Sequence, residues 1–312
     1  MRDLSLDKTL LRKLETSIAG LRLDHPVMNA SGVLGAEPEQ IEILASYGVS
    51  AIVSKTITKN PRRGYDPPIV VELRNGDLLN AVGLANPGIN IIPELIKKAK
   101  SLGKRIIISV GGSSEKEFAE VAEKAEISGA DAVELNLSCP HTKGYGIDIG
   151  GDPSNVAEVV ETVSSIIKIP VIAKLGLSDK IRESAGKALE KGARALTLIN
   201  TIKAMAIDVY SKKPILTNIV GGLSGRSIHP VATRVIYEIY GEYGVDIIGV
   251  GGVFTWEDAA EFILAGARAI QVGTALIKDP GVIHEILRGL IYWLETLETD
   301  RIEDLIGAAH RL

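Results

Sequence analysis

The chain has 312 residues, a formal net charge of −4 and a pI of about 5.8. This acidic balance argues against a dedicated nucleic-acid binder, because such proteins usually carry a basic face. The single cysteine excludes an intrachain disulfide and any cysteine-based zinc or iron–sulfur site within the chain, so no metal site is expected.

The first stretch of the chain, "MRDLSLDKTLLRKLE", is charged throughout and lacks the apolar core of a signal peptide. No run of apolar residues approaches the roughly 18 that a membrane-spanning helix needs. We therefore expect a soluble, cytoplasmic protein that binds neither membrane nor nucleic acid, with residues 1–20 as an N-terminal extension.

Short apolar segments recur along the chain, and most follow a glycine that ends a helical stretch, as in "GVSAIVS" (48–54) and "GADAVEL" (129–135). Glycine is favoured just past a helix C-terminus, where the backbone often needs a positive φ. An apolar run after it is typical of a strand buried on both faces of a parallel sheet. The predicted strands are about 27–30, 51–54, 106–110, 132–136, 171–174, 195–199, 247–250 and 269–272.

Stretches with helical periodicity separate these strands. The predicted helices are 38–47, 88–101, 114–128, 154–168, 179–191, 229–243, 256–265 and 280–297. Eight successive strand–helix units predict an α/β fold of the TIM (β/α)8 barrel type, with a doubly wound open sheet as the alternative. We find no linker, so residues 1–312 are expected to form a single domain.

Three connections are longer than a barrel requires, at about 56–87, 137–153 and 201–228. All three follow the C-terminal ends of predicted strands, which is the face where barrels carry their active sites. Long loops at this face usually have a function. We therefore expect insertions there that contribute to a binding site.

Residues at the strand ends are polar, small or basic. Lys55 and Lys174 end apolar strands, and their ammonium groups are expected in the barrel mouth, although most lysines extend into solvent. The segments "GVGGV" (249–253) and "QVGTA" (271–275) end the seventh and eighth strands, where barrels often bind phosphate through backbone N–H groups. The alternative is that these glycines only form tight turns.

Three amides, Asn80, Asn136 and Asn200, fall in the predicted mouth. An amide offers both donors and an acceptor and can bind a planar imide or carboxamide edge, although Asn also caps turns. Cys139 follows the fourth strand and precedes Pro140. It is either a small buried apolar residue or a thiolate that acts as a base or nucleophile.

Taken together, the motifs resemble the soluble class of dihydroorotate dehydrogenase, and its archaeal members most. The resemblance runs from about residue 20 to 295, with the segments in the familiar order and spacing. It rests on "NASG" (29–32), "SKT" (54–56), "LNAVGLANPG" (79–88), "ELNLSCP" (134–140), "AKL" (173–175), "LINT" (198–201), "GGLSG" (221–225), "GVGGV" and "QVGTA".

The resemblance implies that FMN binds at the barrel mouth and that (S)-dihydroorotate is oxidised to orotate in pyrimidine biosynthesis. It implies that Cys139 is the base on C5 while a hydride passes from C6 to flavin N5. The implied cofactor-binding residues are Ala30, Ser31, Lys55, Thr56, Ser109, Asn136, Lys174, Ile199, Gly225, Gly251, Gly252, Gly273 and Thr274. The implied substrate-binding residues are Lys55, Asn80, Val82, Gly83, Leu84, Asn136, His141, Asn200 and Thr201.

One position departs from the family pattern: His141 stands where soluble-class members usually carry an Asn that binds the substrate. "NLSCPH" also occurs in dihydropyrimidine dehydrogenase, a related FMN enzyme, so a subunit acting on uracil or thymine is an alternative. Two further alternatives are a flavin-free phosphate-binding lyase or isomerase and a non-catalytic binding subunit.

The resemblance also implies a homodimer, with a possible separate electron-transfer subunit that carries FAD and an iron–sulfur cluster. The electron acceptor is fumarate, NAD⁺ through that subunit, or another protein, and the sequence does not distinguish among them.

Overall fold

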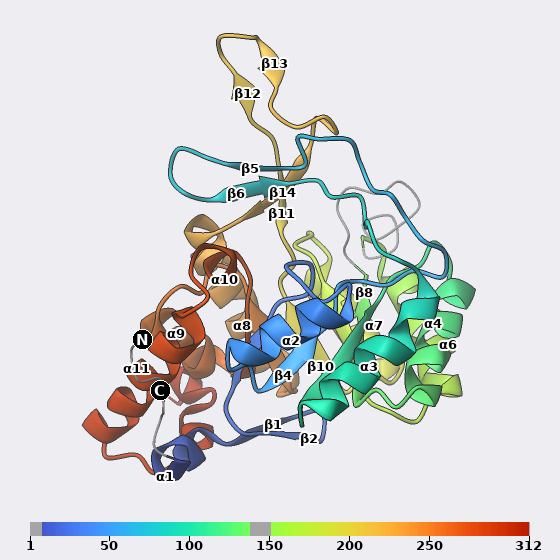
Figure 1. Cartoon of the computed structure of the whole chain (residues 1–312). Coiled ribbons are helices and arrows are strands. Elements are labelled where there is room, and N and C mark those ends of the chain that lie inside the picture. Colours follow the sequence, from blue (N-terminus) through green and yellow to red (C-terminus); the bar gives the residue numbers. More distant parts are fainter. Residues whose placement is uncertain (1–7, 138–150, 312) are drawn as a thin grey trace.

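The structure of the chain is a computed structural model that describes residues 8–137 and 151–311. Within these ranges, eight parallel strands form one sheet in the order β3-β16-β15-β10-β9-β8-β7-β4. The two end strands of this order also contact each other, so the sheet curls into a barrel with helices around it (Figure 1). The barrel strands are β3 (Val27–Asn29), β4 (Ala51–Val53), β7 (Arg105–Val110), β8 (Ala132–Asn136), β9 (Val171–Leu175), β10 (Ala195–Leu198), β15 (Ile247–Val250) and β16 (Ala267–Val272).

The helices that follow these strands cover the outside of the barrel. They are α2 (Pro38–Ser46), α3 (Ile92–Ser101), α4 (Glu115–Ile127), α6 (Pro153–Ile166), α7 (Ile181–Glu190), α8 (His229–Tyr243), α9 (Trp256–Ala265) and α11 (Val282–Thr296). Local signals set their ends: Ser114 caps α4 by accepting from the Glu117 N–H, and Thr255 and Asp258 form a capping box at α9. The predicted barrel strands and helices are therefore confirmed, with boundaries that differ by a few residues.

A short antiparallel hairpin closes the N-terminal end of the barrel. It consists of β1 (Thr16–Ile18) and β2 (Leu21–Leu23), and it follows the short helices α1 (Lys8–Leu11) and η1 (Arg12–Leu14). Ile18 and Leu23 belong to the same buried cluster as Met28, Ile107 and Ile248 from the barrel strands. The sequence patterns did not indicate this hairpin, which plugs the barrel with apolar side chains.

A second sheet lies beyond the C-terminal ends of the barrel strands (Figure 1). It is antiparallel, in the order β11-β14-β6-β5, and is built from two of the long connections that the sequence predicted as loops. Its strands are β5 (Val70–Glu72) and β6 (Leu78–Asn80) from the first connection, and β11 (Ile202–Ala204) and β14 (Gly221–Ser224) from the second. Leu79, Ala81 and Leu216 form its small buried core.

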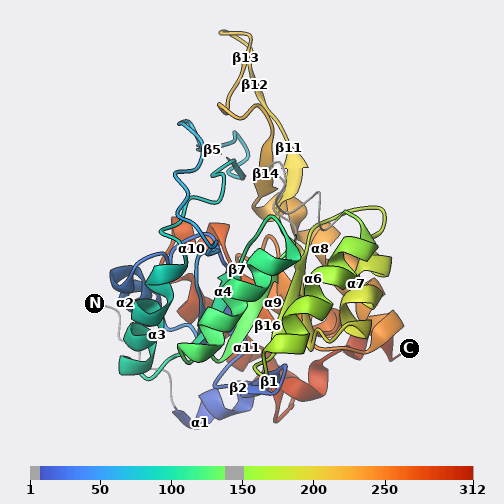
Figure 2. The same ribbon diagram turned by 90° about the vertical axis from the view of Figure 1, so that its right-hand side faces the viewer.

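The remaining elements are short. A hairpin of β12 (Ile207–Asp208) and β13 (Lys213–Pro214) projects furthest from the barrel in both Figure 1 and Figure 2. The helix α10 (Thr274–Lys278) follows β16 directly, and short 3-10 turns complete the chain: η2 (Ile89–Ile91), η3 (Arg226–Ile228), η4 (Ile302–Leu305) and η5 (Ala308–His310). None of the helices in residues 8–137 and 151–311 is long and apolar enough to cross a membrane.

Candidate active site

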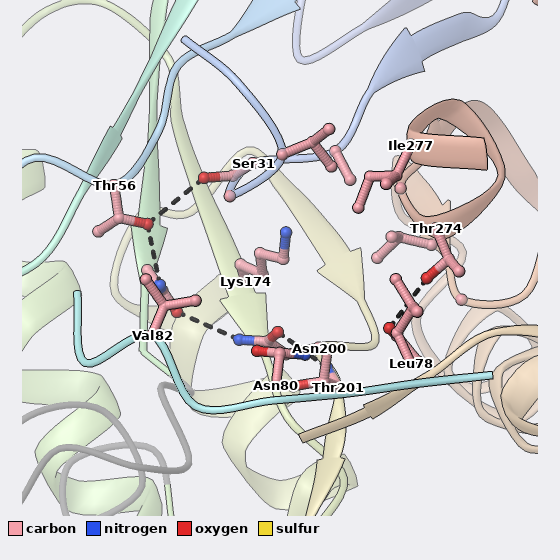
Figure 3. A pocket seen from close by; sticks show the side chains of 18 of the residues that line it. Ser31, Thr56, Leu78, Asn80, Val82, Lys174, Asn200, Thr201, Thr274 and Ile277 are labelled. Atoms are coloured by element: carbon pink, nitrogen blue, oxygen red, sulfur yellow. Dashed lines mark hydrogen bonds between the residues drawn. The ribbon is translucent and has the colours of Figure 1, made fainter. Parts of the chain in front are cut away.

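A cavity of about 220 Å³ opens at the C-terminal ends of the barrel strands, next to the second sheet (Figure 3). Strand ends from seven of the barrel strands supply most of its lining, and the rest comes from β5, β6 and the residues after it, β14, η3 and α10. The predicted site residues that line it are Ala30, Ser31, Lys55, Thr56, Asn80, Val82, Gly83, Leu84, Asn136, Lys174, Ile199, Asn200, Thr201, Gly251, Gly252, Gly273 and Thr274. Residues from segments as distant as 30 and 274 thus meet in one place.

A chain of hydrogen bonds orients the polar side chains on one wall. The Thr201 N–H donates to Asn200 Oδ1 at 2.8 Å, and Asn200 Nδ2 donates to Asn136 Oδ1 at 3.4 Å. Asn136 Nδ2 then donates to Thr56 Oγ1 at 3.0 Å, and Thr56 Oγ1 also lies 3.3 Å from Ser31 Oγ. These contacts fix which way each amide faces, so the wall presents a defined pattern of donors and acceptors to a ligand.

Two lysines bring positive charge to the cavity. Figure 3 shows the ammonium group of Lys174 pointing into the cavity between Ser31 and Asn200. Its side chain is only 5% exposed and donates to Gln271 Oε1 at 3.3 Å. Lys55 is half-buried, and this burial lowers the pKa of its ammonium group below the usual 10.5. Both cations lie where an anionic ligand or an electron-accepting ring would be stabilised.

Glycines form the opposite end of the cavity, after β15 and β16. Gly252 has φ +74°, and a Cβ there would lie 2.7 Å from the Gly225 carbonyl oxygen and 2.7 Å from His229 Cβ. Gly252 lines the cavity, and the backbone is packed so closely against Gly225 and His229 that a larger residue could not occupy this position without displacement. Thr274 Oγ1 donates to Ser224 Oγ at 2.9 Å beside these glycines. Such a cradle of backbone groups and hydroxyls is suited to phosphate oxygens.

The second sheet holds Asn80 against the cavity. Asn80 Nδ2 donates to the Gly222 carbonyl at 2.9 Å, and the two residues are opposite each other in the β6–β14 ladder. Val82, Gly83 and Leu84 continue from β6 along the cavity wall. The segment "NAVGL" thus reaches the site because β6 pairs with a strand from the connection after β10.

Two predicted cofactor-binding residues lie beside the cavity rather than in its lining. Ser109 is fully buried, and its hydroxyl lies 3.0 Å from Thr56 Oγ1, so it contacts the site through Thr56. Gly225 lies against Asp77, next to the lining residue Ser224. Cys139 and His141 fall outside the described residues, as does most of the predicted insertion 137–153.

Sequence reasoning missed an apolar part of the lining and one buried charged group. The additional lining residues are Gly32, Val33, Val70, Leu78, Ser224, Ile228, Val250 and Ile277. Glu134 and Gln271 lie beneath Lys174, inside the barrel. The signal in the sequence that could have indicated the buried charge is Glu134 itself, a glutamate in the middle of a mostly apolar strand. In the part of the chain that the structure describes, no cluster of three His, Cys, Asp or Glu residues is suited to a metal ion.

Comparison with known proteins assigns the family. A family model described as dihydroorotate dehydrogenase matches residues 13–294. A protein of Aeropyrum pernix assigned as a dihydroorotate dehydrogenase A (fumarate) is 49% identical over 303 residues, covering 96% of this chain and 98% of that protein. The dihydroorotate dehydrogenase B (NAD(+)) catalytic subunit of Thermoplasma acidophilum is 46% identical, covering 96% of this chain and 99% of that protein.

The corresponding catalytic subunit of Pyrococcus horikoshii is 45% identical, covering 96% of this chain and 98% of that protein. Among solved structures, that of DHODH from Eimeria tenella in complex with ferulenol has a TM-score of 0.84. It is 24% identical and covers 96% of this chain and 89% of that chain, so the likeness supports the barrel fold alone. The chain therefore belongs to the dihydroorotate dehydrogenase family, a family of flavoenzymes, which confirms the resemblance drawn from its sequence motifs.

Proposed function

We propose that this chain binds FMN in the cavity and oxidises (S)-dihydroorotate to orotate in pyrimidine biosynthesis. The observation that carries the proposal is the convergence, in one cavity, of the Lys174 cation, the Asn136–Asn200 amide wall and the glycine cradle. Family membership supports the reaction, and the convergence supports this cavity as its site.

The cavity fits an FMN group in two respects. Gly251, Gly252, Gly273 and Thr274 would hold the phosphate and ribityl chain, because their backbone groups and the Thr274 hydroxyl line the cavity end after β15 and β16. Ile199 and the apolar lining residues would pack on the ring, and Lys174 would face its polar edge. Ala30, Ser31, Lys55, Thr56 and Asn136 would complete the contacts.

The substrate would bind against the cavity wall that the hydrogen-bonded amides of Asn136 and Asn200 form together with the second sheet. Dihydroorotate carries a carboxylate and a cyclic imide, which need a cation and paired donors and acceptors. Lys55 supplies a cation, and the amides of Asn80, Asn136 and Asn200 supply the hydrogen-bonding groups. The backbone from Val82 to Leu84 and the Thr201 hydroxyl would contribute the remaining contacts, together with His141.

The chemistry requires a base and a dry site. Cys139 follows β8 by three residues, and Asn136 at the end of that strand lines the cavity. We assign Cys139 to the removal of the proton from C5 of the substrate, a step for which a positioned base contributes about 10²–10⁴-fold in rate. A bound flavin would supply the hydride acceptor. The second sheet lies beyond the C-terminal ends of the barrel strands, on the side where the cavity opens (Figure 1).

Electrons must then leave for an acceptor outside the chain. The relatives carry names for both fumarate and NAD(+), and two of them are named catalytic subunits. We expect a homodimer. If NAD⁺ is the acceptor, this homodimer would also bind a separate subunit that carries FAD and an iron–sulfur cluster. Reoxidation of the reduced protein by fumarate, or by NAD⁺ only in the presence of such a subunit, distinguishes the two.

The direct test is to add dihydroorotate anaerobically to the purified protein and to follow the flavin absorbance at about 450 nm. Rapid bleaching is expected, and Cys139→Ala should slow it by at least about 100-fold while retaining its flavin. Uracil added to the chemically reduced protein is the control for the dihydropyrimidine alternative. Reoxidation by uracil, with no bleaching by dihydroorotate, would contradict the proposed substrate.

A further inference from the structure

A carboxylate is buried inside the barrel, directly under the cavity. Glu134 comes from β8 and is 0% exposed, and it does not belong to the cavity lining. Its Oε1 atom has no hydrogen-bond partner among the described residues. A buried charge costs free energy unless other groups compensate it, so its presence at this position calls for a specific role.

Glu134 is part of a network of four residues that ends at Lys174. Gln271 Nε2 donates to Glu134 Oε2 at 2.6 Å, and Thr197 Oγ1 donates to the same oxygen at 2.9 Å. Lys174 Nζ donates to Gln271 Oε1 at 3.3 Å and lies 3.5 Å from Glu134 Oε1. The Gln271 amide satisfies both neighbours in this orientation only, because it donates to the carboxylate and accepts from the ammonium group.

The network controls two properties of Lys174. Gln271 and Glu134 hold the ammonium group from below, so its remaining N–H capacity is directed into the cavity, as Figure 3 shows for the side chain. The carboxylate also places a negative charge 3.5 Å behind the positive one, in a region where water is excluded and charges interact over longer distances. The field that the cavity experiences is therefore that of an ion pair rather than that of an isolated cation.

We propose that Glu134 is a positioning residue that orients Lys174 and weakens its positive field on the bound flavin. This inference rests on the proposed function, because it presumes a flavin in the cavity. A cation near a flavin favours the form that has accepted electrons, since that form carries more negative charge. The carboxylate opposes this effect, which keeps the reduction potential low enough for electrons to pass to the next acceptor.

The test is the reduction potential of the flavin in the full-length holoprotein, measured by equilibration with a reference dye. Glu134→Gln keeps the size of the side chain and one acceptor oxygen for Gln271 and Thr197, but it removes the charge. The substitution should increase the protein's affinity for reduced FMN relative to oxidised FMN at least about tenfold. For a two-electron couple this raises the reduction potential by about 30 mV. Glu134→Asp keeps the charge but withdraws it from Lys174, so it should shift the potential in the same direction by less.

A double-mutant cycle separates this role from a merely structural one. In a Lys174→Met background, Glu134→Gln should raise the potential by less, because only the direct effect of the carboxylate charge on the flavin remains and its effect through Lys174 is gone. An unchanged potential in Glu134→Gln with an unaltered thermal midpoint would overturn the inference, as would an equal rise with and without Lys174. If Glu134→Gln does not fold, Glu134→Asp carries the same test. A flavin-free unsubstituted protein would instead contradict the proposed function.

Discussion

The side-chain amide of Asn29 pairs with the backbone of Val53 as a neighbouring strand would. The Val53 N–H donates to Asn29 Oδ1 at 3.0 Å, and Asn29 Nδ2 donates to the Val53 carbonyl at 2.7 Å. Asn29 ends β3 and Val53 ends β4, the two strands at the ends of the barrel sheet. At the start of the same seam, the Ser50 N–H donates to the Val27 carbonyl at 3.0 Å. One amide therefore replaces ladder hydrogen bonds where the barrel closes.

We expect Asn29→Ala to destabilise the protein strongly. The substitution leaves the N–H and carbonyl of Val53 buried without their partner, and an unsatisfied buried group costs about 1–3 kcal/mol. The free energy of unfolding should therefore fall by about 3 kcal/mol, measured by denaturant titration. Asn60→Ala, at an exposed loop position, is the matched control and should change it by less than about 0.5 kcal/mol. Equal stability of the two variants would mean that the seam closes without Asn29.

Gly252→Ala should weaken FMN binding. A Cβ at this position would lie 2.7 Å from the Gly225 carbonyl oxygen, so the backbone of the cradle must move. We expect the dissociation constant for FMN to rise at least about tenfold, equivalent to about 1.4 kcal/mol, in a fluorescence titration of the apoprotein. Gly103→Ala is the control, because Gly103 has a similar φ of +67° but a Cβ there has nothing within 4 Å. Unimpaired FMN binding by Gly252→Ala would place the phosphate elsewhere.

Lys55 should make ligand binding sensitive to alkaline pH. Burial lowers the pKa of its ammonium group, so the cation is lost at a lower pH than for an exposed lysine. The affinity for orotate, measured at equilibrium, should fall as pH rises through that lowered pKa, by about 10–100-fold for a charge-assisted hydrogen bond. Lys55→Arg should move the loss to higher pH, because arginine stays charged. Lys55→Met should bind orotate weakly at every pH. If this variant bound orotate as tightly as the unsubstituted protein, Lys55 would be excluded from the substrate contacts.

His25 should make the fold sensitive to acid. Burial, with a contribution from the Lys104 charge, lowers the pKa of His25 to about 4. Its ring is also held in one tautomer, because Nδ1 accepts from the Val27 N–H at 3.3 Å and Nε2 contacts the Gly48 carbonyl at 3.0 Å. Between about pH 6.5 and 4 the unfolded chain binds a proton that the folded chain does not, so stability falls as pH falls through this window.

From pH 7 to pH 5 this contribution should amount to about 2 kcal/mol in the free energy of unfolding. His25→Gln removes the titrating group. The loss of unfolding free energy between pH 7 and pH 5 should therefore be about 2 kcal/mol smaller in this variant than in the unsubstituted protein. Asn60→Ala removes no titrating group, so it should retain the full acid dependence and is the control. A pH profile of His25→Gln that parallels the unsubstituted protein would assign the acid sensitivity to other groups.

The sequence by itself determined the barrel, because its signals are local. Apolar runs after glycines marked the strands, and Gly129 and Gly192 indeed take φ values of +94° and +106° after α4 and α7. The motif residues at the strand ends were also identifiable, since the C-terminal ends of barrel strands meet at one face. The expectations of a single domain, a homodimer and a cytoplasmic location stay predictions, as do the roles of Cys139 and His141.

Only the tertiary structure decided how the parts between the strands assemble. Asn80 reaches the cavity because β6 pairs with β14, and its partner Gly222 is 142 residues away in the chain. Glu134 and Gln271, 137 residues apart, form the network under Lys174 in the same way. Unlike the barrel strands, the strands of the second sheet do not alternate with helices, so no repeating pattern marked them. One glutamate in an apolar strand does not reveal its partner. Both features depend on contacts that exist only once the barrel has closed and brought distant segments together.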